Sequence, residues 1–361
     1  MQSSMKRGAR YMIQIAIVAS LAGAAWLPSA FAAQAGEESV AQADQVEAQA
    51  HADWREAITH TSAPAEGCYQ AEYPSIVWKQ VGCNVAPARV HSAPPVPSRR
   101  NLSLAEGGAS QTTGNGHDYA LSSSSLISTT TGTFPSVTGV TSETGVGVAA
   151  FGGGGILGPN EYTLQINSNF NSTTAACKSH SGCTVWQQFI YSPDYNVNGQ
   201  AAVFMQYWLI GYGGTSCPSG FGSDGAGDCY KNSAAVTAPD VPATQLANLK
   251  LAGTVVSGGN DTVTFTNGTH AYSVSGKDSV LYLATVWKQS EFNVVGNAGG
   301  SEAKFNTGSS ITVKVAVSNG STSAPTCASN AGTTGETNNL NLGSCTASSG
   351  STPSIQFPET N

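Results

Sequence analysis

The chain has 361 residues, of which only 10% are charged, with a formal net charge of −7 and a pI of about 5.3. No arginine follows Arg100. Because nucleic acids and anionic membranes are bound through clustered cations, this composition argues against both as partners. The abundance of Gly, Ser, Thr and Asn favours an exported all-β protein over a helical enzyme.

Residues 1–32 have the pattern of a signal peptide. Lys6, Arg7 and Arg10 precede the apolar run Met12–Leu27, and Ala30–Ala32 then supplies a small-x-small cleavage site. No second apolar stretch of membrane-spanning length follows. We therefore expect a secreted product, extracellular or periplasmic, without a membrane span and monomeric.

Residues 33–113 are expected to form a pro-region or linker. The stretch 33–66 is rich in Ala, Gln and Glu and predicts a weak helix or mobile chain. Gly67–Cys83 is expected to form a small disulfide loop, and the proline-rich segment ending at Pro97 favours an extended linker. The pair Arg99–Arg100 is either a processing point or part of a solvated linker.

Residues 114–345 are expected to form one all-β domain, an antiparallel β-sandwich of concanavalin or jelly-roll type, with a flexible tail at 346–361. Period-two alternation predicts its strands. The clearest are Tyr162–Phe170, Val185–Tyr191, Ala202–Tyr212 and Ile311–Val317. In the first of these, the polar positions are all amides or hydroxyls.

Eight cysteines are spaced as four close pairs. An even number of cysteines in an exported chain predicts disulfides, and four local bridges satisfy the spacing most simply. The expected pairs are Cys68 and Cys83, Cys177 and Cys183, Cys217 and Cys229, and Cys327 and Cys345. A zinc site would need C-x-x-C pairs, which the sequence lacks.

Familiar hydrolase signatures are absent, since the sequence contains no G-x-S-x-G, H-E-x-x-H or D-[ST]-G motif. We expect no cofactor and no metal: Asp224 and Asp228 are interpreted as part of a disulfide-closed turn rather than a Ca²⁺ site. What remains is amides on aromatic strands and the carboxyl of Glu291, which is flanked by apolar residues. Partial removal from water raises the pKa of such a carboxyl and suits it to act as acid and base. The alternative is that Glu291 and the glutamines only solvate a sheet.

The segments Val185–Ile190, Phe204–Trp208 and Ser290–Val295 resemble, in order and type, those that carry the site of the eqolisins, which are glutamic peptidases of β-sandwich fold. The resemblance implies an acid endopeptidase made as a zymogen. In such an enzyme Glu291 would activate water against a peptide bond, and a glutamine would stabilise the oxyanion. The related neprosin-type peptidases pair two glutamates, which would direct attention to Glu161 or Glu302.

The phase of the first aromatic strand bears on the choice between Gln187 and Gln188. Gln188 shares a face with Trp186 and Ile190, which is interpreted as core, so Gln187 is favoured as the catalytic partner of Glu291. The residues expected to bind substrate are Gln188, Gln206, Trp208, Tyr191 and Asn293. The expected substrate is a polypeptide; the alternative is a non-catalytic module that binds glycans or surface polymers, with a polysaccharide as partner.

Overall fold

The computed structural model describes residues 30–86, 91, 112–114, 118–149, 153–169, 171–213, 216–329 and 331–361. The predicted targeting segment lies outside these residues, apart from the backbone of its last three. The chain divides into two compact units, 1–49 and 50–361. The second unit holds the sheets and the candidate site, and its architecture is that of a β-sandwich.

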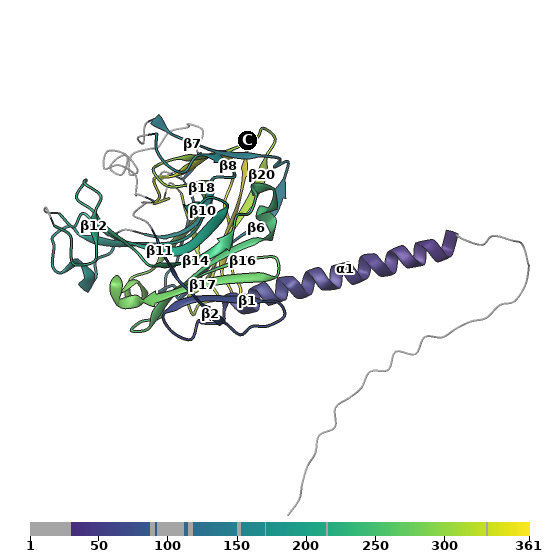
Figure 1. The fold of residues 1–361 in the computed structure, drawn as a ribbon, viewed down its shortest axis with the longest axis horizontal. Coiled ribbons are helices and arrows are strands. Elements are labelled where there is room, and N and C mark those ends of the chain that lie inside the picture. The colour runs from purple at the N-terminus through teal and green to yellow at the C-terminus, as the bar shows by residue number, and fades with distance from the viewer. Residues whose placement is uncertain are drawn as a thin grey trace, which may run out of the picture. The chain divides into compact units, whose positions relative to one another are not determined.

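Within the described residues, the strands form two mostly antiparallel sheets of fourteen and ten strands (Figure 1). In spatial order the larger sheet contains β2 (Lys79–Val81), β1 (Gly67–Glu72), β17 (His270–Lys277), β16 (Asn260–Asn267), β15 (Leu249–Thr254), β6 (Thr129–Thr138), β20 (Ser310–Ser318), β24 (Ser354–Thr360), β22 (Thr337–Leu342), β19 (Glu302–Phe305), β7 (Glu143–Val146) and β8 (Gly158–Pro159), with β23 (Thr346–Ser348) beside β24 and β4 (Thr112–Gly114) beside β22. The smaller sheet contains β12 (Gly222–Ser223), β13 (Cys229–Asn232), β11 (Gln200–Ile210), β10 (Thr184–Val197), β9 (Tyr162–Ser168), β18 (Gln289–Gly296), β5 (Ala120–Ser122) and β21 (Thr326–Ala328), with β14 (Ala234–Pro239) beside β11 and β3 (Asn84–Val85) beside β14. The predicted all-β sandwich is confirmed.

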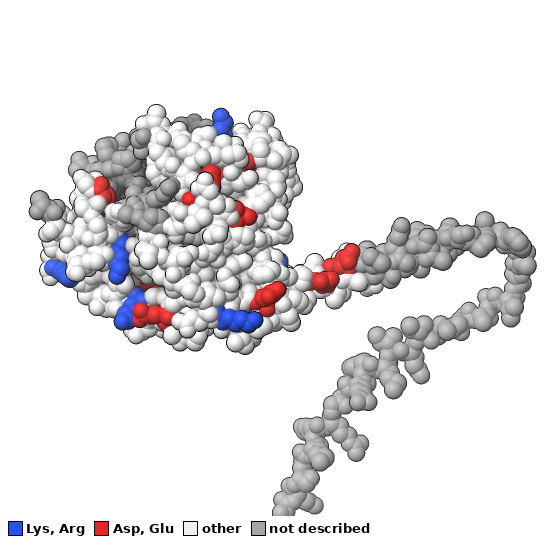
Figure 2. Space-filling model, in the orientation of Figure 1, with Lys and Arg blue, Asp and Glu red and all other residues white. Residues whose placement is uncertain are grey.

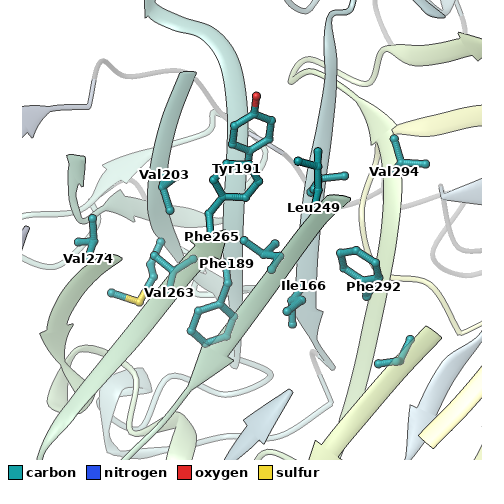
Figure 3. Close-up of a cluster of buried hydrophobic side chains, with 14 of the residues drawn as sticks. Ile166, Phe189, Tyr191, Val203, Leu249, Val263, Phe265, Val274, Phe292 and Val294 are labelled. Carbon is teal, nitrogen blue, oxygen red and sulfur yellow. The ribbon is translucent and has the colours of Figure 1, made fainter. Parts of the chain in front are cut away.

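The two sheets share one hydrophobic core, to which both contribute side chains (Figure 3). Two aromatic rings of the smaller sheet lie directly over glycines of the larger one. An added Cβ at Gly132 would come within 2.1 Å of the Phe292 ring, and one at Gly253 within 2.6 Å of Phe189. These glycines allow the rings to approach the opposite backbone, which fixes how the sheets are placed against each other.

The N-terminal part of the second unit is not a separate linker but packs on the sandwich. Helix α1 (Ala30–Thr59) ends in this unit, and six residues of β1 pair with β17 from Gly67↔Ser275 to Glu72↔His270. Trp54, Ile58 and Trp78 form a satellite cluster with Ala271 of β17. The predicted start of the domain near residue 114 is therefore wrong, because the stretch from Gly67 to Val81 supplies two strands of the larger sheet.

The C-terminal residues are strands rather than a flexible tail. Seven pairs join β24 to β20, from Ser310↔Thr360 to Ala316↔Ser354, and β24 also pairs with β22. Ile355, Phe357 and Glu359 are fully buried. The prediction of a tail at 346–361 is wrong: alternation in this short segment is interrupted at Pro358, but its apolar positions still face the core.

Replacing Phe357 with alanine is expected to lower the free energy of unfolding by about 3 kcal/mol, because a fully buried ring is lost from the core. Urea unfolding at fixed pH measures this. The matched control is the exposed neighbour on the same strand, Gln356→Ala, which should change stability by less than about 0.5 kcal/mol. Equal effects of the two substitutions would mean that β24 contributes nothing to the core.

The four predicted local disulfides are all present, as Cys68–Cys83, Cys177–Cys183, Cys217–Cys229 and Cys327–Cys345. Besides α1, short 3₁₀ helices occur at Ala175–Cys177, Ala243–Asn248, Asp278–Val280 and Leu283–Thr285. In the described part of the chain, none of the helices combines the length and the hydrophobicity needed to cross a bilayer.

Candidate functional site

The hairpin of β10 and β11 is buried on both of its faces. One face, with Phe189 and Tyr191, packs into the core between the sheets. The other, with Trp186 and Gln188, points away from the larger sheet and is covered by other parts of the chain. Because aromatic residues lie on both faces, residue type alone does not reveal which face meets the second sheet.

Gln187 lies on the core face. Its Nε2 is 3.7 Å from Met205 Sδ, and its side chain is hydrogen-bonded to that of Asp261. Glu291 lies on the other face of the sheet, beside Asn167. The prediction that Gln187 and Glu291 face one groove is therefore wrong, because the aromatic face that carries Gln187 is the one that packs against the larger sheet.

Tyr191 is also a core residue and not part of a binding face. Its ring stacks on Phe265 with the centroids 4.1 Å apart, and its hydroxyl donates to Pro239 O and accepts from Val241 N. These contacts all hold the side chain within the protein core. The prediction that Tyr191 binds substrate is therefore wrong. Tyr191 and Gln187 lie on the same face of β10, and that face packs against the larger sheet.

The opposite face of the smaller sheet is lined by amides, indoles and carboxyls, and we call it the polar face. Its members are Gln165, Asn167, Trp186, Gln188, Gln206, Trp208, Glu291 and Asn293. Five of the residues predicted to form a site are thus brought together here. None of the eight side chains is more than 2% exposed, so each depends on the others for hydrogen bonds.

Four polar-face residues form a row across adjacent strands. The register pairs Gln206 with Gln188, Gln188 with Asn167, and Asn167 with Glu291. At the usual strand spacing, the backbones of Gln188 and Glu291 are about 10 Å apart, with Asn167 between them. Gln165 Oε1 links Gln188 to Asn167, since it accepts from Gln188 Nε2 at 3.1 Å and from Asn167 Nδ2 at 3.4 Å. Asn167 Nδ2 also donates to Glu291 Oε2 at 3.4 Å.

The two oxygens of Glu291 have different surroundings. Oε2 accepts from Thr333 N at 2.6 Å and Thr333 Oγ at 3.0 Å as well as from Asn167, whereas Oε1 has no partner among the described side chains and backbone groups. Oε1 is nevertheless buried, and an added Cβ at Gly332 would lie only 2.9 Å from it, so a larger residue there would crowd that oxygen. Burial raises the pKa of Glu291, although the bonds from Thr333 and Asn167 oppose part of the shift.

Comparison with protein-family models, curated proteins and solved structures found no match to this chain. On the side of the molecule drawn in Figure 2, charged side chains are sparse and scattered.

Two further carboxyls lie next to Glu291 on the polar face. Asn293 Nδ2 donates to Asp118 Oδ2 at 2.7 Å and to Glu359 Oε1 at 2.8 Å. Burial, together with the negative charges of Glu291 and Glu359, raises the pKa of Asp118 well above its ordinary value. Burial also raises the pKa of Glu359, to about 8. Asn293, predicted to bind substrate, therefore holds a cluster of carboxyls that favours proton uptake.

Two parts of the chain cover the polar face. Thr333 contacts Glu291, and the nearby Glu336 accepts from Gln165 Nε2 at 3.4 Å; burial raises the pKa of Glu336 to about 7. The second cover is His91, which lies between β3 and β4 in sequence and is completely buried here. Access of a substrate to Glu291 would require this cover to move.

Several residues that form or cover the polar face were not among the site residues predicted from the sequence. Gln165 and Asn167 stand on the polar side of a predicted strand, so the signal that could have found them is the uniform amide and hydroxyl side of Tyr162–Phe170. Asp118, Thr333 and Glu336 carry no comparable signal, since each reaches the site from a short or irregular segment far away in sequence.

Three surface cavities of about 280, 280 and 420 Å³ lie elsewhere, beside the end of α1 on the outer side of β6 and β15. The first is lined mainly by threonines and serines, and none of the three contains a polar-face residue. The described residues include no group of three or more His, Cys, Asp or Glu placed to hold a metal ion. Asp224 Oδ1 instead accepts from Ala226 N and Asp228 N within its own turn.

Proposed function

We propose that this protein is a secreted peptidase active in acid, in which Glu291 and Gln188 of the polar face perform the chemistry. The observation that supports it is the row that sets a buried carboxyl and a fixed amide on one face, with the width of one strand between them. Gln188 takes the place that the eqolisin-like resemblance gives to a glutamine. Its Oε1 accepts from Trp208 Nε1 at 3.0 Å, which turns its NH₂ towards β9 and away from Trp208.

In the proposed reaction, Glu291 Oε1 removes a proton from water while the water oxygen bonds to the carbonyl carbon of the substrate. The NH₂ of Gln188 donates to the oxyanion of the tetrahedral intermediate. Protonated Glu291 then gives its proton to the amide nitrogen as the C–N bond breaks, which releases an acid and an amine. Asn167 and Thr333 keep Glu291 Oε2 in place throughout.

We further propose that the full chain is an inactive precursor. His91 lies on the polar face and blocks the approach to Gln188 and Glu291, so activity requires its release. The predicted signal peptide, the four disulfides and the buried carboxyls would suit a secreted protein that works in an acidic medium. Mass spectrometry of the chain after incubation at pH 4 would show whether activity appears together with a cut between His91 and Asp118.

Replacing Gln188 with alanine is expected to lower kcat about 100-fold in cleavage of a denatured protein at pH 4–6, because a donor to the oxyanion is lost. The matched control is its neighbour on the core face. Gln187→Ala should lower stability, since the side chain of Asp261 loses a partner, but leave kcat of the folded enzyme within about threefold. Loss of activity in the Gln187 variant and not in the Gln188 variant would contradict the proposal.

A specific observation favours one other function, a glycan-binding module. Trp186 and Trp208 lie with ring centroids 5.7 Å apart beside the amides of Gln188 and Gln206, and such a combination of rings and amides suits sugar rings. Polysaccharide binding by the acid-incubated chain, with no proteolysis between pH 3 and 8, would favour this function over the peptidase.

A further inference from the structure

His91 belongs to the same chain as the polar face and is bound on it. Its backbone N–H donates to Gln206 Oε1 at 2.9 Å, and its Nδ1 lies 3.3 Å from Gln165 Nε2. Its ring stands beside Tyr195 and Phe204, with centroids 6.0 Å away in each case. The contacts of His91 therefore show how the polar face holds a main-chain N–H and a side chain of the size of an aromatic ring.

The acceptor for that N–H is fixed by other side chains. Gln206 Nε2 donates to Asn232 Oδ1 at 2.6 Å, and Gln206 Oε1 also accepts from Trp208 Nε1 at 3.1 Å. The amide cannot turn over without losing both bonds, so its carbonyl stays aimed at the bound chain. An acceptor held in this way binds a peptide N–H whatever side chain follows it.

The side-chain pocket is fixed as well. Tyr195 stacks on Phe204 at 4.5 Å between ring centroids, and its hydroxyl accepts from Asn232 Nδ2 at 2.9 Å, so the wall and the acceptor belong to one network. On the other side, Gln165 Nε2 donates to Thr163 Oγ at 2.9 Å, which places its NH₂ at the imidazole. The pocket therefore joins one stacked aromatic pair to one polar contact, which suits a flat ring with a polar edge.

We propose that Gln206, Tyr195, Phe204 and Gln165 form a peptide subsite beside Gln188, which takes a histidine or aromatic residue of the substrate and which His91 occupies in the full chain. This inference rests on the proposed function, since it assigns the specificity of the same polar face. The ligand is an extended peptide rather than a sugar, because the group that Gln206 Oε1 binds in this structure is a main-chain N–H.

The test uses the full chain and a fluorescein-labelled peptide of the sequence Ala86–Val96, whose binding is followed by anisotropy. A His91→Ala chain should bind the peptide at least tenfold more tightly than the wild-type chain, in which His91 fills the subsite. Exposed His270 is the control, since His270→Ala should behave as wild type. In the His91→Ala chain, a peptide with alanine in place of histidine should bind at least tenfold more weakly, and one with phenylalanine within about threefold.

Equal binding of the histidine and alanine peptides to the His91→Ala chain would overturn the subsite, as would no binding at all. A second measurement does not depend on this variant: cleavage sites in a denatured protein digested by the acid-incubated wild-type chain should show His, Phe, Tyr or Trp at one fixed position. Cleavage without that preference would overturn the subsite and leave the peptidase proposal standing. Peptide binding without any cleavage would support the subsite and remove the peptidase.

Discussion

Replacing Glu291 with glutamine is expected to lower kcat about 10⁴-fold, because one carboxyl serves first as base and then as acid. The substitution keeps the size of the side chain and an oxygen that can accept from Thr333, so the fold should be retained. The measurement is the steady-state cleavage of a quenched fluorescent peptide at pH 4–6 by chains incubated in acid, with thermal unfolding to confirm that the variant is folded.

Glu302 provides the matched control for this experiment. It is a glutamate on β19 of the other sheet, whose backbone pairs with β7 and β22, so Glu302→Gln should leave kcat within about twofold. If both variants kept full activity, Glu291 would not be the catalytic base. If the Glu302 variant alone lost activity, the neprosin-type pairing of two glutamates would become the better interpretation.

The free energy of unfolding is expected to fall by several kcal/mol between pH 5 and pH 8. Burial raises the pKa of Glu143 to about 9, that of Glu336 to about 7 and that of Glu359 to about 8, all above the ordinary value of 4.5. The folded state thus holds protons that the unfolded chain releases. Stability is therefore fully present below about pH 4.5 and is lost as pH rises towards 7–9, by at most about 1.4 kcal/mol per pH unit for each group.

Urea unfolding at pH 5, 6.5 and 8 measures this slope. Glu359→Gln removes one of the titrating groups while keeping an acceptor for Asn293 Nδ2, so its stability should fall less steeply with pH than that of the wild type. A chain whose stability stayed constant or rose over this range would show that these carboxyls are already ionised in the folded state.

Strand positions and disulfides could be predicted from the sequence because they depend on local signals, namely period-two alternation and closely spaced cysteines. Strand phase could not, as Gln187 and Gln188 illustrate. In a hairpin buried on both faces, alternation separates two sets of residues but does not say which set meets the other sheet. That choice depends on glycines such as Gly132 and Gly253, which lie far away in sequence and receive the rings of Phe292 and Phe189.

The candidate site could be predicted only in part for a related reason. Glu291, Gln188, Gln206, Trp208 and Asn293 stand on long strands and could be singled out by residue type. The residues that contact or cover them lie in segments without a periodic sequence pattern. Asp118, Thr333 and His91 are examples. Their roles depend on long-range packing, which neither composition nor periodicity contains.

The position of β24 has a consequence for how the larger sheet folds. This strand is the last of the chain, yet it lies inside the larger sheet between β20 and β22. The larger sheet therefore stays open between β20 and β22 until Ser354–Thr360 is in place. A chain in which β24 has not yet docked exposes the edges of both neighbouring strands, and such unpaired edges favour association with other chains.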